Sequence, residues 1–336
     1  MSNSTKKFIV KLRNTVLAVG TVAVVGVSAL SLASCGGKKE NKVDANGNLS
    51  GQISLSGAFA LYPLAVQWAD DFQKLHPDVR IDLSAGGAGK GITDALADVV
   101  DLGMVSRELA PEEIKKGAVG FAVAKDAVVP TINAKNPNLK AVLEHGLTRD
   151  AAIGLWITGK TKTWGQVAGN DNKTGVVVYT RSDACGAAET WAKWLGKKQE
   201  DLKGTAVYGD PGVAQAVQKD VNGIGLNNIG YAYDAKTGKP NPGILVAPID
   251  VNNNGKIDPD ENFYDNKEQI AKAIAEGKYP SPPARDLYLV AHGNPKDPVV
   301  KAFLKYVLTK GQAAAAPQGY IAISKDKINN ELKKLK

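Results

Sequence analysis

The sequence predicts an α/β fold in which a ligand binds where parallel strands end. Two observations lead to this prediction. Strand-like segments, glycine turns and helix-like segments alternate along residues 51–106. Farther along, residues 181–195 place an arginine and a turn of small residues directly before an amphipathic helix. In open α/β sheets, ligands bind outside the carboxyl ends of the strands, so these turns are the expected binding region.

The elements follow in chain order from hydrophobic periodicity. Alternating apolar residues predict a strand at 52–56, and apolar residues at helical spacing predict a helix at 62–75. A strand, a glycine-rich turn with its helix, and another strand follow at 79–83, 86–99 and 101–106. Later in the chain the same reasoning predicts one extended segment and three helices, at 243–248, 267–276, 299–308 and 325–336.

The N-terminus indicates export from the cytoplasm. Basic residues at 6–13 precede an uncharged apolar run, 16–32, which ends in Leu32-Ala33-Ser34-Cys35. An uncleaved membrane anchor is the alternative, because the run is about as long as the shortest spanning helices. The Leu-x-x-Cys ending resembles a bacterial lipobox, which implies that residues 1–34 are a signal peptide and that Cys35 carries lipid. The mature chain would then be held at a membrane by that lipid.

Length, charge and cysteine content limit what the mature chain can be. Without residues 1–34, 302 residues remain, enough for one large or two medium domains. The formal charge of +8 falls to +4 when the four basic residues of that segment are removed, which is too mild to suggest nucleic acid. Cys185 is then the one cysteine without lipid, so no intramolecular disulfide is expected. Residues 35–50 lack periodicity and predict a flexible tether, with folding from Gly51.

Two turns have the character of anion sites. Before the amphipathic helix within residues 181–195, Arg181 offers a planar guanidinium, and the first amides of that helix have no internal partner. The glycine turn 86–91 matches neither nucleotide fingerprint, since Ile92 follows Gly91, but its amides can also face an anion. A solvated arginine before an ordinary helix and a glycine turn used for packing are the alternatives.

Cys185 admits three interpretations. A thiol at a helix N-terminus near Arg181 is expected to have a lowered pKa, which would make it a soft ligand or a redox target. A buried small residue in place of serine is the alternative. A cysteine hydrolase would need a base, and none of the histidines, at positions 76, 145 and 292, lies in a turn motif. No enzymatic activity is therefore expected.

A second motif, residues 250–261, matches a calcium-binding loop. Oxygen ligands stand at loop positions 1, 3, 5, 9 and 12, position 7 coordinates through its backbone carbonyl, and Gly255 supplies the bend at position 6. The ligands are Asp250, Asn252, Asn254, Lys256, Asp258 and Glu261. We expect a structural Ca²⁺ in this insertion, and the alternative is a turn rich in Asp and Asn without metal.

Taken in order, the turns resemble those of the phosphate-binding proteins of bacterial ABC importers. The resemblance covers nearly all of residues 51–323 and rests on segments 56–63, 86–89, 101–107, 161–164, 181–187, 217–227, 279–288, 311–312 and 319–320. It implies a type II periplasmic binding fold with lobe 1 at 51–128 plus 288–336 and lobe 2 at 129–287. Two crossing strands, near 127–132 and 287–290, would join the lobes, and the ligand would lie in the cleft between them.

The sequence departs from this family at the expected ligand contacts. Where the family commonly has hydroxyl donors and an aspartate, this chain has Phe59, Ala88, Ser106 and Cys185-Gly186-Ala187. Arg181 and Ser106 remain, and a backbone amide donates whatever its side chain. The expected donors besides Cys185 are therefore Arg181, Ser106 and the amides of Ala58, Phe59, Gly87, Ala88, Gly186 and Ala187.

These features predict a lipid-anchored extracytoplasmic binding protein. It would capture an inorganic oxyanion, phosphate first among them, and deliver it as a monomer to a membrane permease of the ABC type, without nucleic acid. Because hydroxyl donors are missing, a changed ligand, either another oxyanion or a small carboxylate, stays open. A further alternative is a surface or sensory lipoprotein that has the same fold but takes no part in transport.

Overall fold

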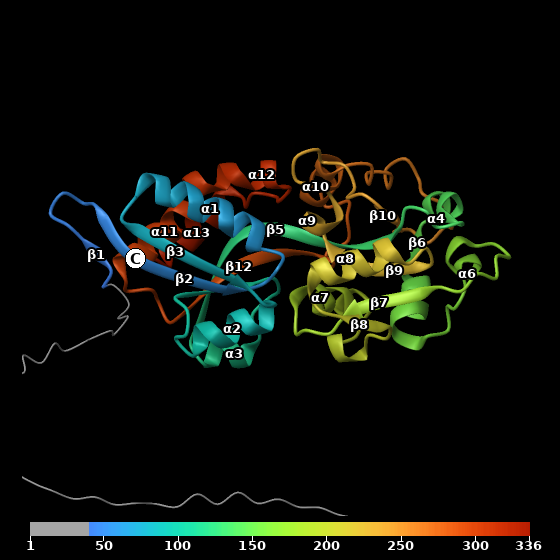
Figure 1. Cartoon of the computed structure of the whole chain (residues 1–336), viewed down its shortest axis with the longest axis horizontal. Helices are drawn as coiled ribbons and strands as arrows, with labels where there is room; N and C mark the ends of the chain where they lie inside the picture. Colours follow the sequence, from blue (N-terminus) through green and yellow to red (C-terminus); the bar gives the residue numbers. More distant parts are fainter. Residues whose placement is uncertain (1–39) are drawn as a thin grey trace, which may run out of the picture. The chain divides into compact units, whose positions relative to one another are not determined.

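The computed structural model describes residues 40–336 and has the predicted mixed α/β architecture (Figure 1). Its main sheet has ten strands in the order β1-β2-β4-β12-β5-β9-β7-β8, with β3 beside β2 and β10 beside β5, while β11 and β6 pair separately. The strands are β1 Lys42–Val43, β2 Leu49–Gly57, β3 Val79–Ala85, β4 Leu102–Val105, β5 Ala118–Asn133, β6 Leu147–Thr148, β7 Val177–Arg181, β8 Thr205–Val207, β9 Gly223–Asn228, β10 Ile244–Val246, β11 Ile249–Asp250 and β12 Ala284–His292.

Helices cover this sheet and fill most of the connections. The α-helices are α1 Tyr62–Leu75, α2 Ala88–Leu96, α3 Pro111–Lys115, α4 Leu139–His145, α5 Arg149–Ile153, α6 Trp164–Ala168, α7 Gly186–Trp194, α8 Gly209–Lys219, α9 Ile229–Ala232, α10 Lys267–Ala275, α11 Pro298–Leu308, α12 Ala315–Gln318 and α13 Lys325–Lys333. A π-helical turn at Gly154–Thr158 and 3₁₀ turns at Gln199–Asp201 and Lys310–Ala314 complete the list.

Helix α1 shows how the sequence pattern becomes packing. It begins and ends at the predicted residues, with Pro63 in its first turn, where the missing N–H costs nothing. Its apolar stripe, including Trp68 and Phe72, is buried in a hydrophobic core. The indole Nε1 of Trp68 donates a 2.8 Å hydrogen bond to the carbonyl of Gly311, which fixes the helix against the C-terminal part of the chain.

The start of the folded region differs from the sequence prediction. Residues 42–43 form strand β1, which pairs antiparallel with β2, so this part of the expected tether is structured. Asp44 closes the hairpin, because its Oδ1 accepts the amides of Asn46 and Asn48 at 2.9 and 2.7 Å. Gly47, at a φ of 83°, takes the left-handed conformation that the turn needs. The prediction missed this hairpin because the hairpin depends on turn chemistry, not on hydrophobic periodicity.

The two large hydrophobic cores lie toward opposite ends of the crossing strands, which contribute residues to both. One is built from residues 49–124 and 287–323, and the other from residues 127–284. Strands β5 and β12 run antiparallel along each other and are the long connections between the two lobes (Figure 1). The exact lobe boundaries given above stay a prediction. Both lobes are thus tied to one pair of strands.

The predicted signal peptide, Cys35 and the first residues of the predicted tether lie outside the described residues. Residues 39–336 form a compact unit of their own. Along residues 40–336, none of the helices combines the length and hydrophobicity needed to cross a membrane.

Candidate functional site

Four turns, three from lobe 1 and one from lobe 2, lie close together, and each follows the carboxyl end of a strand. In lobe 1 the turns follow β2, β3 and β4, which pair in parallel, and in lobe 2 the turn follows β7. The turns after β3 and β7 touch directly, since the amide of Gly89 donates a 3.0 Å hydrogen bond to the carbonyl of Ala184. The structure therefore brings together the turns that the sequence singled out.

Four of the six predicted amide donors are available to a ligand. Within residues 40–336, the amides of Phe59, Ala88, Gly186 and Ala187 have no protein acceptor. Ala88 begins helix α2, and Gly186 and Ala187 begin helix α7, so these three are first-turn amides at the positive end of a helix dipole. An oxyanion placed between the two helices would receive hydrogen bonds from both lobes.

The other two predicted donors were wrong. The amide of Ala58 donates to the carbonyl of Met104 at 2.8 Å, and the amide of Gly87 donates to the carbonyl of Gly57 at 3.0 Å. Both bonds are part of the close packing between β2, β4 and the start of α2. Because an amide has one hydrogen, neither group can donate well to a ligand without losing this bond.

Ser106 and Gly186 meet across the cleft. Ser106 is buried, and a methyl group added to Gly186 would overlap both its carbonyl oxygen and its hydroxyl. Only glycine at this position allows lobe 2 to approach the end of β4 so closely. The Ser106 hydroxyl thus lies beside Gly186, the first residue of α7.

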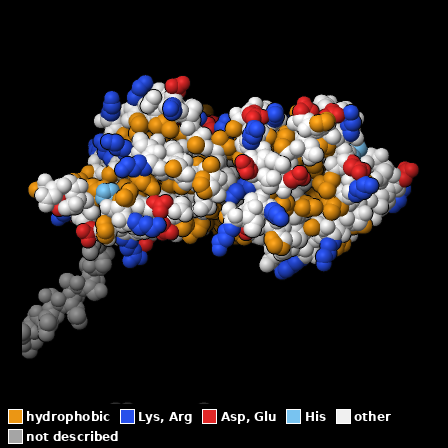
Figure 2. All heavy atoms as spheres, turned by 90° about the horizontal axis from the view of Figure 1, so that it is seen from above, with side chains coloured by type: hydrophobic (Ala, Val, Ile, Leu, Met, Phe, Trp, Pro, Cys, Tyr) orange, Lys and Arg blue, Asp and Glu red, His pale blue; other side chains and the backbone are white. Residues whose placement is uncertain are grey.

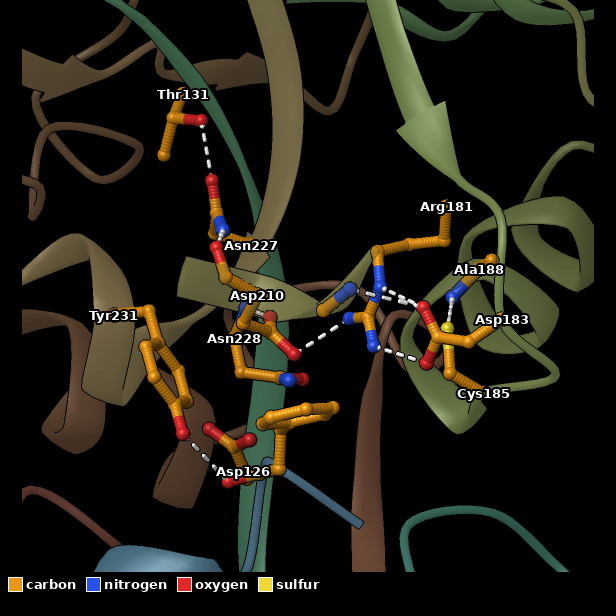
Figure 3. A network of polar contacts seen from close by, with 12 residues as sticks. Asp126, Thr131, Arg181, Asp183, Cys185, Ala188, Asp210, Asn227, Asn228 and Tyr231 are labelled. Atoms are coloured by element: carbon orange, nitrogen blue, oxygen red, sulfur yellow. Dashed lines mark hydrogen bonds and ion pairs between the residues drawn. The ribbon is translucent and has the colours of Figure 1, made fainter. Parts of the chain in front are cut away.

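Arg181 is held by two aspartates that the sequence analysis missed (Figure 3). Its Nε and Nη2 donate to the two carboxylate oxygens of Asp183, at 2.8 and 2.6 Å, and its Nη1 donates to Asp210 at 2.5 Å. The arginine is 5% exposed, and its guanidinium lies over the ring of Phe59, 5.6 Å from the ring centre.

These carboxylates determine the state of the guanidinium. Burial opposes its charged form, but the carboxylates of Asp210 and Asp183 raise the pKa of Arg181. Three of its five N–H groups are used, so two remain for a ligand. Arg181 is therefore a fixed, fully charged donor and not a free anion trap. Asp183 follows it closely in the sequence, whereas only the fold brings Asp210 to it.

The network continues from Asp210 to the crossing strands. Asp210 also accepts the amide of Asn228 through its other carboxylate oxygen at 2.9 Å, and its carbonyl accepts the side-chain amide of Asn227. Arg285, from crossing strand β12, donates through Nη2 to the side-chain oxygen of Asn228. Beside it, Asp126 of crossing strand β5 completes a buried cluster that links the ligand turns to the lobe connection (Figure 3).

Cys185 is not a thiolate. Its sulfur caps helix α7 by accepting the amide of Ala188 at 3.4 Å, and it is buried. Burial raises the pKa of Cys185 to about 12, against the opposing effect of Arg181. The predicted lowering was wrong because the sequence did not show that the thiol is fully enclosed, and the alternative of a buried serine substitute accounts for the residue. A neutral thiol also argues against the hydrolase.

Side-chain contacts hold the lobes together beside the ligand turns. The hydroxyl of Tyr231, in lobe 2, donates to the carbonyl of Phe59 at 3.2 Å. Arg107, which follows β4, binds Glu113 with two hydrogen bonds, at 2.8 and 2.7 Å, and also contacts Glu189 of α7 at 2.8 Å. The described conformation is therefore closed around the turns.

In the predicted calcium loop, the carboxylates at both ends accept backbone amides. Asp250, at position 1, accepts the amides of Asn253, Asn254 and Gly255, so it draws the loop around itself. Glu261, at position 12, accepts the amides of Val251, Asn252 and Asp258. In the described part of the chain, no three His, Cys, Asp or Glu side chains converge as metal ligands. The side-chain nitrogens of Asn252 and Asn254 both donate to Asp258, so coordination would need their oxygens to turn inward.

Comparison with known proteins identifies the family. A model of the PBP superfamily domain matches residues 42–310. The chain belongs to the PBP superfamily. The phosphate-binding protein PstS of Bacillus subtilis is 26% identical over 310 residues, covering 89% of this chain and 92% of the relative. That of Pseudomonas aeruginosa (strain PAO1) is 27% identical over 345 residues, covering 95% and 98%.

Solved structures of this superfamily share the fold. A candidate phosphate ABC transporter substrate-binding protein with bound phosphate, from Clostridium perfringens, superposes with a TM-score of 0.66 at 22% identity. The superposed region covers 82% of this chain and 100% of the Clostridium perfringens chain. An ABC-type phosphate transport receptor from Vibrio cholerae gives a TM-score of 0.58 at 19% identity, covering 81% and 100%. The predicted two-lobed fold and the expected relationship to phosphate-binding proteins are thereby confirmed.

Proposed function

We propose that this PBP superfamily member captures phosphate outside the cytoplasm and delivers it to an ABC importer. The observation that carries the proposal is the set of unpaired amides at Phe59, Ala88, Gly186 and Ala187, which meet from two lobes beside Arg181. The names of the relatives, all phosphate-binding proteins, support phosphate over other oxyanions.

Binding would rest on main-chain dipoles and one guanidinium. Helices α2 and α7 each direct a positive end at the anion, and Arg181 adds its two remaining N–H groups. Closing the cleft removes water, which strengthens each of these bonds. The closed lobes, held by contacts such as Arg107 with Glu189, would be the form that a permease recognises.

Calorimetric titration of residues 39–336 with phosphate tests this proposal, and Gly186→Ala is the sharpest variant. The added methyl would overlap Ser106 only when the lobes close, so binding should be lost while the lobes stay folded. Gly175→Ala is the matched control, because its methyl would approach nothing closer than 3.9 Å. If phosphate produces no heat with the unaltered protein, titration with sulfate, arsenate and dicarboxylates decides whether the ligand has changed.

The membrane attachment is a separate part of the proposal. The Leu32-Ala33-Ser34-Cys35 ending supports cleavage before Cys35 and a lipid on its sulfur. Expression of the full chain should place it in the membrane fraction with lipid on Cys35, and Cys35→Ala should release it or leave it unprocessed. We also propose that the protein is a monomer, which light scattering coupled to gel filtration can measure.

We further propose that residues 250–261 bind a structural Ca²⁺. The turn around Asp250, with Gly255 at a φ of 81°, supports this, and the amide of Ile257 donates to Glu144 at 2.8 Å, which fixes the loop against α4. Calcium should raise the melting temperature of the protein, and Glu261→Gln should remove the increase. An equal increase in that variant would contradict a site at this loop.

A further inference from the structure

Helix α11 and the C-terminal end of the chain form a groove with an apolar floor and a basic rim. Its lining consists of Lys301, Ala302 and Lys305 from α11, and of Leu332, Leu335 and Lys336 from α13 and the residues after it. The three apolar side chains are only partly buried against the core of lobe 1, so a partner can still contact them. In the described chain, this lining contains no Asp or Glu.

The fold does not neutralise the lysines of this groove. Lys305 is exposed and Lys301 is half-buried, and within residues 40–336 neither of them forms an ion pair. Glu331, the acidic residue of α13 next to the groove, already pairs with Lys334. The carboxylate of Lys336 offsets no more than the ammonium of the same residue. The groove therefore keeps a positive charge that no described side chain balances.

The N-terminal segment is held at the same end of lobe 1. The side-chain nitrogen of Asn41 donates a 2.8 Å hydrogen bond to Asp297, which caps α11. Lys301 and Lys305 follow Asp297 at intervals of four residues, so they lie on the same face of the helix, about 6 and 12 Å farther along it. The C-terminus also lies beside β1 and β2 in Figure 1. The basic groove thus adjoins the place where the N-terminal segment is attached.

The hairpin of β1 shortens the distance over which a lipid on Cys35 could hold the protein. Cys35 precedes Asn41 by six residues, and a chain of that length spans at most about 22 Å when fully extended. Had the whole of residues 35–50 been a free tether, fifteen residues would have allowed about 54 Å. Because Asn41 is fixed to α11, a lipid on Cys35 would keep this end of lobe 1 close to the bilayer.

We propose that the groove between α11 and the C-terminal residues is an interaction surface for the anionic phospholipid headgroups of the membrane that carries the protein. This inference rests on the proposed lipid on Cys35. The ammonium groups of Lys301 and Lys305 pair with headgroup phosphates, and the exposed parts of Leu332 and Leu335 face the less polar layer below them. The tether and the groove then attach one end of lobe 1 at two points, which restricts rotation of the protein on the membrane.

Sedimentation with lipid vesicles tests the inference on residues 39–336, which lack Cys35 and so report on the surface without the lipid. The probes are vesicles of phosphatidylcholine alone and of phosphatidylcholine mixed with phosphatidylglycerol. Binding should occur with the anionic vesicles only and should weaken as salt is added. Lys301→Gln combined with Lys305→Gln should weaken binding about 25-fold, because each lysine near an anionic surface contributes about fivefold.

A second pair of substitutions is the matched control. Lys160→Gln combined with Lys197→Gln gives the same net charge, and both lysines are exposed on lobe 2 without an ion-pair partner among the described residues. This control should bind anionic vesicles as tightly as the unaltered protein. Equal losses in the two double variants would show that only net charge matters, and would overturn the inference. Equal binding to both kinds of vesicle by the unaltered protein would overturn it as well.

A second copy of this chain is the other occupant that the test can reveal. A dimer in gel filtration that Lys301→Gln with Lys305→Gln converts to a monomer, without binding to vesicles, would overturn the inference.

The remaining outcomes separate the surface from the anchor on which the inference rests. Lipid on Cys35 of the full chain, without vesicle binding by residues 39–336, would overturn the inference and keep the anchor. Vesicle binding that depends on Lys301 and Lys305, without lipid on Cys35, would keep the surface and overturn the anchor.

Discussion

Asp126 makes a quantitative prediction about stability in the absence of ligand. Burial raises its pKa from 3.8 to about 7, although Arg285 and the nearby amides of Ala127 and Ile229 oppose the rise. Between these two values the native protein holds a proton on Asp126 that the unfolded chain has released. The contribution of this group to the free energy of unfolding is therefore complete below about pH 4 and is lost as the pH rises through about 7.

The size of this loss follows from the shift in pKa. A change of about three units corresponds to about 4 kcal/mol. In Asp126→Asn the side chain is neutral at every pH, so this loss disappears. The variant should be more stable than the unaltered protein at pH 8. At pH 5, where Asp126 is protonated, the difference in the free energy of unfolding between the two proteins should be smaller.

Urea unfolding of residues 39–336 at pH 5 and pH 8 measures the effect without phosphate. The drop in the free energy of unfolding between these pH values should be smaller in Asp126→Asn than in the unaltered protein by about 3 kcal/mol, because only the part of the shift between pH 5 and about 7 falls in this range. All other titrating groups are common to both proteins and cancel in this comparison. The same drop in both proteins would refute the reasoning, since Asp126 would then be ionised in the native state without cost.

Further predictions concern single contacts. Arg181→Ala should lower the free energy of unfolding in urea by about 3–5 kcal/mol, since Asp183 and Asp210 keep buried charges without a partner. A loss under 1 kcal/mol would contradict this. Cys185 should react with a thiol reagent at pH 8 only after unfolding, because its pKa is about 12. Trp68→Phe should cost about 1–3 kcal/mol in urea, since the carbonyl of Gly311 loses its donor. An unchanged midpoint would argue against that bond.

Much of lobe 1 was predictable because its signals are local. Helix α1 has its predicted bounds, since a proline in its first turn and a regular apolar stripe fix both its period and its start. Strands β3 and β4 likewise lie within two residues of their predicted ends. The glycine turn after β3 was predicted over residues 86–91, but helix α2 begins at Ala88, so only the first two of these residues precede the helix.

The ligand site was predictable only in part. Arg181 and the turns were found from the motifs, but which amides are free depends on strand pairing, as Ala58 and Gly87 show. The partner of Arg181 at position 210 comes from a separate helix, so no local pattern indicated it. Asp126 and Arg285 become neighbours only through the register of β5 and β12, which the sequence does not specify. The pKa of Cys185 was wrong for a similar reason, since burial is a tertiary property.

The two aspartates on Arg181 have a consequence for the kinetics of capture. A side chain fixed at three of its donors has no rotamers left to lose when a ligand arrives, so the entropic cost of ordering it has been met during folding. Their two negative charges also outweigh the one positive charge of the guanidinium, and Lys and Arg are scattered among acidic side chains on the face shown in Figure 2. Long-range electrostatic attraction between the protein and an anionic ligand is therefore weak, and the rate of ligand association should change little with ionic strength.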